Sequence, residues 1–268
     1  MLSRYRCDRD VLVRAVASFR NKRILVLGDM MLDRFVWGAV SRISPEAPVP
    51  VVEIKTETTC LGGAANVAAN ISSLGGIPVP LGIVGGDSEG SRLREEFRAL
   101  WSPLSGLLVD RNRPTSIKTR IIAHHQQVCR TDREDRSPVS PEVQSKIVEK
   151  FRAALSSADA VIVSDYAKGL ISPALLRRTL PLAEGAGKAV CVDPKMKDLS
   201  VYRPATVITP NMAEAERASG ISISGTGDLI RAGALAPGGA GAFVIDPRPT
   251  DGATRVAQAG SVGAHDDH

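Results

Sequence analysis

Two features that direct a protein to nucleic acids are scarce in this sequence. Aromatic residues make up 4% of the chain, which argues against the stacking surfaces that bind single-stranded nucleic acids. The net charge of +5 comes without a dense block of lysine and arginine, so we do not expect nucleic acid as a partner. A modest positive charge instead suits small phosphorylated molecules.

Long apolar runs are also lacking. No stretch approaches the roughly 18 apolar residues that a membrane-spanning helix needs. Residues 4–10 are mostly charged and have no apolar core region of the kind found in export signals. We therefore expect a cytoplasmic protein that does not bind membranes.

Cysteine is rare and widely spaced. The four residues Cys7, Cys60, Cys129 and Cys191 form no C-x-x-C pair and have no histidine at ligand spacing. This spacing argues against a zinc site or a disulfide framework. We expect reduced, mostly buried thiols.

Short apolar runs alternate with helical patterns along the chain. We predict strands at 24–27, 79–84, 160–163, 189–192 and 207–209, and helices at 10–20, 88–100 and 141–156. Each strand ends in polar residues. This alternation predicts a single α/β unit built on a doubly wound, mostly parallel sheet with its site along one edge.

Two stretches break this alternation. Residues 35–55 contain Pro45, Pro48 and Pro50 among alternating apolar residues, a pattern tolerated at a sheet edge or in a flap. Residues 116–130 are also β-rich. We predict that the two stretches pair as a small antiparallel lid, which either excludes water from a reaction or forms a homodimer contact.

The segment 61–70, LGGAANVAAN, places two glycines before an alanine-rich helical run. Glycines let a backbone approach a ligand closely, and the amides at a helix N-terminus bind hydroxyls or anions. The same composition also suits a helix packed tightly against a neighbour. The segment alone leaves both interpretations open.

Polar residues collect where the predicted strands end. They are Asp33, Asp165, Lys168, Asp193, Lys195, Asn211 and Glu214. Lysines attract phosphate, and carboxylate or amide oxygens hold Mg2+ directly or through water. Each residue alone also has a structural explanation, since Asp193-Pro194 suits a turn and Asn211 suits a helix cap. Together they favour phosphoryl transfer.

Two motifs carry a resemblance to a known family. Gly62-Gly63-Ala64-Ala65-Asn66-Val67-Ala68 resembles the first signature of the ribokinase, or PfkB-type, carbohydrate kinases, and Asn211 with Glu214 resembles their N-x-x-E element. The stretches 41–50 and 165–169 are similar to those of family members that phosphorylate D-glycero-β-D-manno-heptose 7-phosphate. The resemblance extends over about residues 23–234.

The resemblance implies a ribokinase-like fold with a β lid, a sugar phosphate as acceptor, and MgATP as donor. Its implied sugar-binding residues are Asp33, Gly62, Gly63 and Asn66, together with Asp165 and Lys168. Its implied nucleotide-binding residues are Asp193, Lys195, Asn211 and Glu214, and Glu214 is also the implied magnesium ligand. Basic residues of the predicted lid, namely Lys118, Arg120 and Arg130, with Gln127 beside them, are our candidates for binding the 7-phosphate.

The sequence departs from the family pattern near its end. Family members carry a late G-A-G-D element that supplies the catalytic base and backbone donors. Residues 239–242 read GAGA, without the acid, and Asp228 of GTGD comes too soon after Glu214. We interpret Asp228 as a first-turn acid of an ordinary helix. The catalytic residue therefore stays unassigned.

We expect a kinase domain over residues 1–235, incomplete at its C-terminal end, and an atypical Gly/Ala/Pro-rich tail over 236–268 with one strand at 242–245. Two hypotheses follow. The chain is a working sugar kinase, or it is a truncated remnant that binds sugar or sugar phosphate without turnover.

Overall fold

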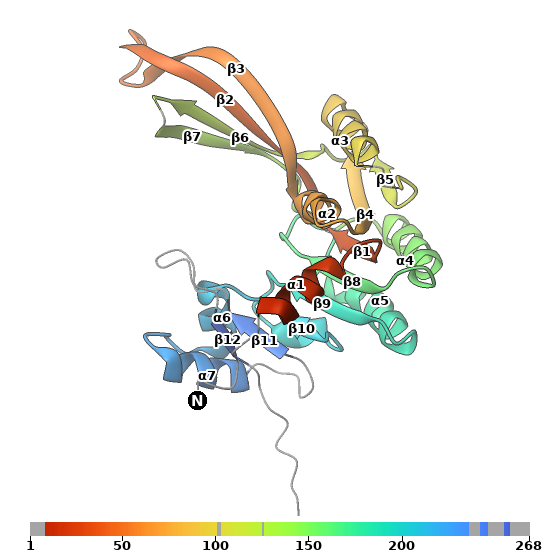
Figure 1. The fold of residues 1–268 in the computed structure, drawn as a ribbon. Helices are drawn as coiled ribbons and strands as arrows, with labels where there is room; N and C mark the ends of the chain where they lie inside the picture. Colours follow the sequence, from red (N-terminus) through yellow and green to blue (C-terminus); the bar gives the residue numbers. More distant parts are fainter. Residues whose placement is uncertain (1–8, 101–102, 125, 236–241, 246–254, 258–268) are drawn as a thin grey trace, which may run out of the picture.

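The computed structural model describes residues 9–100, 103–124, 126–235, 242–245 and 255–257. They form two sheets, a main sheet flanked by helices and a lid sheet that projects from it (Figure 1). This is the ribokinase-like α/β architecture predicted from the sequence.

The main sheet contains the predicted apolar strands in parallel. Its order is β12-β11-β10-β9-β8-β1-β4-β5, and only β12 runs antiparallel to its neighbour among these described strands. The bounds are β1 Arg23–Gly28, β4 Ile77–Gly85, β5 Leu107–Asp110, β8 Ala160–Ser164, β9 Ala189–Asp193, β10 Val207–Ile208, β11 Ala242–Ile245 and β12 Arg255–Ala257. The strand predicted at 242–245 is therefore confirmed.

The helices cover both faces of this sheet because its central strands are apolar on both sides. On one face, α4 Pro141–Leu155 and α5 Pro173–Gly185 pack with Leu25 and Leu27 of β1. On the other, α2 Ala64–Ser73 and α3 Ser88–Ala99 pack with Val26. Alternate residues of one strand thus enter separate cores.

Local signals begin the helices. Ser140 and Ser172 cap α4 and α5 with their side chains, and a proline follows each cap. Asn211 and Glu214 form a capping box at the start of α6 Met212–Ser219. The helix-cap interpretation of Asn211 is confirmed, and α7 Thr226–Leu235 carries Asp228 in its first turn as expected.

The lid sheet has the order β3-β2-β6-β7, with β2 Met30–Ile43, β3 Pro50–Gly63, β6 Ser116–Ala123 and β7 Gln126–Arg133. The predicted pairing of the two β-rich stretches is confirmed, but the prediction that it is antiparallel is wrong. The strands β2 and β6 run parallel, because the chain returns to the lid only after crossing the main sheet through β4 and β5. The lid is therefore a mixed sheet (Figure 1).

Two smaller features differ from expectation. Cys60 and Cys129 are exposed on the lid and Cys191 is half-buried, so for the three described cysteines the prediction of mostly buried thiols is wrong; Cys7 lies outside the described residues. The helix α1 Arg9–Ala17 forms where predicted but buries none of its own residues. No helix in the described part of the chain is long and apolar enough to cross a bilayer.

Candidate active site

Asp33 lies on β2, on the lid face that also carries Lys118 and Arg120. The strand register places Asp33 opposite Lys118 of β6. Arg120 Nη1 donates to Asp33 Oδ1 at 2.7 Å, and both side chains stay partly exposed. Asp132 and Arg130 of β7 lie opposite Lys118 and Arg120, so this face of the lid carries two carboxylates and three cations.

The two glycines of the LGGAAN segment end β3, directly before α2. A Cβ atom on Gly62 would lie 2.8 Å from Asp33 Oδ2, and Gly63 has a φ of +54°. A side chain at Gly62 would push the Asp33 carboxylate aside, and the positive φ of Gly63 favours glycine there. Asn66 is exposed in the first turn of α2, while Ala64, Ala65 and Ala68 are buried. The segment therefore combines glycines at a crowded turn with a helix that packs closely against its neighbours, which are the two interpretations that the sequence left open.

The loop after β8 is held from two sides. The buried Asp29 carboxylate accepts hydrogen bonds from the backbone N–H of Tyr166, at 2.9 Å, and of Lys168, at 3.1 Å. Burial raises the pKa of Asp29 to about 6, although the two hydrogen bonds act to lower it. Asp165 Oδ2 accepts from the hydroxyl of Tyr202 at 2.6 Å. The hydrogen bond between Tyr202 and Asp165 therefore fixes the loop on its second side.

Lys168 is almost fully buried, and its ammonium group is paired. Its Nζ lies 2.5 Å from Glu134 Oε2, and Glu134 also pairs with Arg136. Glu134 directly follows the last lid strand. The segment that leaves the lid therefore contacts the loop after β8.

Tyr166 connects the lid to the rest of the site. Lys118 Nζ lies 5.7 Å from the centre of the Tyr166 ring, within the range of a cation–π contact. Burial and the charge of Lys168 lower the pKa of Lys118. Tyr166 also lines a cavity of the main domain, so this residue borders both the lid and that cavity.

That cavity has a volume of about 240 Å3 and lies at the ends of β8, β9 and β10. All four residues predicted to bind nucleotide line it. The lining residues are Asp165, Tyr166, Asp193, Pro194, Lys195, Thr209, Asn211 and Glu214. Their convergence follows from the parallel sheet, whose strands all end at one edge.

Glu214 is a buried carboxylate among the residues that line this cavity, and each of its oxygens has a partner. Lys195 Nζ lies 2.9 Å from Oε1, and the Asn211 N–H donates to Oε2 at 2.9 Å. In the described residues, no group of three or more Asp, Glu, His or Cys side chains is placed to hold a metal ion. Mg2+ often binds through one or two carboxylates plus water and phosphate, and the donor set of Asp193 and Glu214 fits that mode.

The remaining candidate residues do not line this cavity. Arg130 pairs with Asp132 on the same exposed strand, and Gln127 lies opposite Ile122, further along the lid than Arg120. Asp228 is ion-paired with Arg231 and accepts hydrogen bonds from Ser224, which lowers its pKa to about 2. A carboxylate held in that way is a weak base.

Two tyrosines and one acid have roles that the sequence pattern does not predict. Tyr166 lies within the 165–169 stretch, and Tyr202 and Glu134 lie outside every motif. The hydroxyl of Tyr202 accepts from the N–H groups of Lys195 and Met196, both at 3.0 Å, while it donates to Asp165. It therefore ties together the loops after β8 and β9. A tyrosine in a long polar segment carries no local signal for such a role.

The sequence profile described as "pfkB family carbohydrate kinase" matches residues 21–263. The chain belongs to this family. Members are ATP-dependent carbohydrate kinases that use Mg2+, so the pfkB chain described here is a carbohydrate kinase by family.

Curated relatives are similar over most of this pfkB chain. The protein named "Bifunctional protein HldE" from Caulobacter vibrioides is 48% identical over 212 residues, which cover 79% of this chain and 43% of that protein. The protein of the same name from Helicobacter hepaticus is 44% identical over 214 residues, covering 80% and 44%. The chain thus spans less than half the length of these relatives.

Solved structures share the fold. Arabidopsis thaliana ribokinase complexed with ribose and ATP aligns with a TM-score of 0.62 at 16% identity, covering 84% of this chain and 72% of that one. The tetrameric inhibited form of phosphofructokinase-2 from Escherichia coli aligns with a TM-score of 0.66 at 18% identity, covering 84% and 73%. At such identities the likeness establishes the fold alone.

Proposed function

We propose that this pfkB chain transfers the γ-phosphoryl group of ATP to a sugar that already carries a phosphate, and that the sugar is D-glycero-β-D-manno-heptose 7-phosphate. The observation that carries the proposal is the position of Lys118, which reaches from the lid to Tyr166 at the rim of the cavity. A cation there suits a phosphorylated acceptor held beside the donor. The stretches 41–50 and 165–169 support the heptose.

The sugar-side residues have distinct proposed roles. Asp33 accepts hydrogen bonds from sugar hydroxyls, and Gly62, Gly63 and Asn66 let the first turn of α2 approach the sugar. Lys118 and Arg120 bind the 7-phosphate. Lys168 and Asp165 support the sugar from the loop after β8, and Arg130, which lies opposite Arg120 and pairs with Asp132, is a further candidate for the phosphate.

On the nucleotide side, Lys195 attracts the phosphates of ATP, while Asp193 and Asn211 line their cavity. Glu214 is the proposed ligand of Mg2+, directly or through water. When bound, the ion neutralises charge that develops on the transferring phosphoryl group. The phosphoryl group goes to the anomeric hydroxyl, on the route to ADP-heptose for bacterial lipopolysaccharide.

An assay of ADP formation tests this proposal. Heptose 7-phosphate with MgATP should give ADP and a new anomeric phosphate by 31P NMR, whereas the same heptose without its phosphate should react poorly. D33N should weaken sugar binding about 10- to 100-fold, because hydrogen bonds to a charged group are lost. Equal rates with and without the 7-phosphate would contradict a phosphorylated acceptor.

Binding without turnover is the second candidate function. The state of Asp228 favours it, because the acid of the GTGD segment is paired with Arg231 and its pKa is low. Calorimetry separates the two candidates. Sugar-phosphate binding without ADP formation above a no-enzyme control supports the second, and rapid turnover removes it.

We also propose a homodimer formed through the lid. Large apolar side chains of the lid are exposed, namely Trp37, Ile43, Val49, Ile54 and Val128. They come from three strands of the lid and the connection between β2 and β3, and exposed apolar side chains on a sheet that projects from the main domain suit an interaction surface. Sedimentation velocity should show a dimer that I54D weakens, and a monomer at all concentrations would exclude it.

A further inference from the structure

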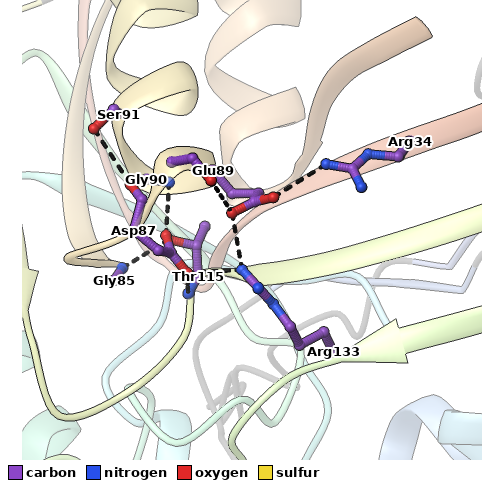
Figure 2. Close-up of polar contacts among 9 residues, drawn as sticks. Arg34, Gly85, Asp87, Glu89, Gly90, Ser91, Thr115 and Arg133 are labelled. Atoms are coloured by element: carbon purple, nitrogen blue, oxygen red, sulfur yellow. Dashed lines mark hydrogen bonds and ion pairs between the residues drawn. The ribbon is translucent and has the colours of Figure 1, made fainter. Parts of the chain in front are cut away.

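The lid meets the main domain at the first turn of α3, where acidic and basic side chains form one network (Figure 2). Asp87 caps α3, and its Oδ1 accepts from the N–H of Gly90 at 2.9 Å. Glu89 lies in the same turn. This turn is the part of the main domain that contacts the lid arginines Arg34 and Arg133.

Asp87 contacts the chain at the start of β6 and at the end of β7. The buried Thr115 donates to Asp87 through its hydroxyl, at 2.5 Å, and through its N–H, at 3.0 Å. Arg133 Nη2 donates to Asp87 Oδ2 at 2.7 Å. Gly85, at the end of β4, donates to the Thr115 hydroxyl at 2.8 Å. Asp87 thus joins two lid strands to the main sheet (Figure 2).

Glu89 bridges two arginines from different lid strands. Arg34 Nη2 of β2 lies 3.1 Å from Oε1, and Arg133 Nη2 of β7 lies 3.0 Å from Oε2. The Glu89 side chain is only 15% exposed, which limits screening of these pairs by solvent. The hydrogen bond from Ser88 and the charge of Arg133 hold the pKa of Glu89 below its ordinary value. It is therefore ionised at neutral pH.

Each lid arginine is a sequence neighbour of a residue in the candidate site. Arg34 follows Asp33, and successive strand residues point to opposite faces, so Asp33 faces Arg120 while Arg34 faces α3. Arg133 precedes Glu134, which pairs with Lys168. A movement of either arginine relative to α3 would therefore move a site residue.

We propose that Asp87 and Glu89 clamp the lid at a fixed angle, and that Glu89, Arg34 and Arg133 are positioning residues for the sugar. The clamp holds β2, β6 and β7, while β3 continues directly into α2. Without the clamp, the lid pivots and Asp33 is no longer held over the site. The part of this proposal that concerns sugar binding rests on the proposed function, and the part that concerns the lid angle does not.

Distances between spin labels test the lid angle without any ligand. Labels at the exposed residues Lys55 of the lid and Arg177 of α5, in a chain with its four cysteines replaced, should give one narrow distance distribution. E89A and R34A should broaden it, and R34K, which keeps the cation, should largely restore it. The matched control E95A removes an exposed carboxylate of the same helix and should leave it narrow. An unchanged distribution in folded E89A, verified by circular dichroism, would overturn the clamp.

Calorimetry tests the positioning role. If loss of the clamp leaves about a tenth of molecules with the lid in place, the affinity of E89A for heptose 7-phosphate falls about tenfold. The affinity for ATP should not change, because the cavity residues lie on the main domain. Equal sugar affinities for E89A and wild type would overturn the positioning role. If the wild type itself binds no sugar phosphate, the proposed function fails, whereas the label distances still decide the clamp.

Discussion

Asp29 is the buried carboxylate that organises the loop after β8. Both hydrogen bonds from that loop reach one of its oxygens, and it is 2% exposed. Ionisation of a group so placed opposes folding, because the charged form loses its hydration. Asp29 thus holds the loop after β8 at a cost to stability.

This cost gives a pH prediction. The pKa of Asp29 is about 6 in the folded chain against an ordinary value of 3.8, so the native state binds the proton more tightly. Its contribution therefore lowers wild-type stability as pH rises from about 4 to 6. D29N does not titrate, so its stability relative to wild type should increase over that window by up to about 3 kcal/mol. Urea unfolding at several pH values measures this, and a flat difference would contradict it.

Tyr202 is a second residue with a testable structural role. Its hydroxyl donates to Asp165 and accepts from two backbone N–H groups of the loop after β9. Y202F leaves these buried groups without a partner, at a cost of about 1–3 kcal/mol in the free energy of unfolding. Nucleotide affinity should fall as well, because both loops line the cavity. A loss of stability with unchanged nucleotide affinity would restrict Tyr202 to folding.

At the scale of elements, the end of β3 packs closely against the Asp33 side chain at Gly62. A Cβ there would lie 2.8 Å from Asp33 Oδ2. G62A should therefore displace Asp33 and weaken sugar binding at least about tenfold, by analogy with the loss of one charge-assisted hydrogen bond.

The matched control for G62A is G185A. Gly185 ends α5, and a Cβ there would meet no atom within 4 Å. G185A should leave sugar affinity unchanged, as calorimetry can measure. Equal affinities for both variants would mean that Asp33 does not contact the sugar.

The sequence predicted the elements of the main sheet well, for a physical reason. Runs such as 24–27 are apolar on both faces, a property of strands covered by helices on both sides. The nucleotide-side residues could be predicted together because Asp193 and Asn211 each follow such a strand. Parallel strands then bring these strand ends to one edge.

What the sequence did not predict depends on contacts between distant segments. Local composition does not say whether β2 and β6 run parallel, since their pairing joins residues about 85 positions apart. The exposed Cys60 and Cys129 belong to the same lid, whose strands lie largely outside the main core. The roles of Glu134 and Tyr202 likewise come from partners far along the chain.

In the whole molecule, the lid and the main sheet form the two sides of the proposed site. Asp33 and Lys118 belong to the lid, and Lys195 and Glu214 belong to the main domain. Tyr166 lies between them, in contact with Lys118 and at the rim of the cavity. The clamp at α3 explains how a projecting sheet keeps this alignment.

A crystal structure with heptose 7-phosphate and a non-hydrolysable MgATP analogue shows whether the two ligands meet at Tyr166. We expect sugar hydroxyls on the Asp33 carboxylate, the sugar phosphate beside Lys118, and the γ-phosphate in the cavity of Lys195 and Glu214, with Tyr166 between the two ligands. A sugar bound away from the Asp33 face of the lid, or a nucleotide bound outside that cavity, would contradict this arrangement.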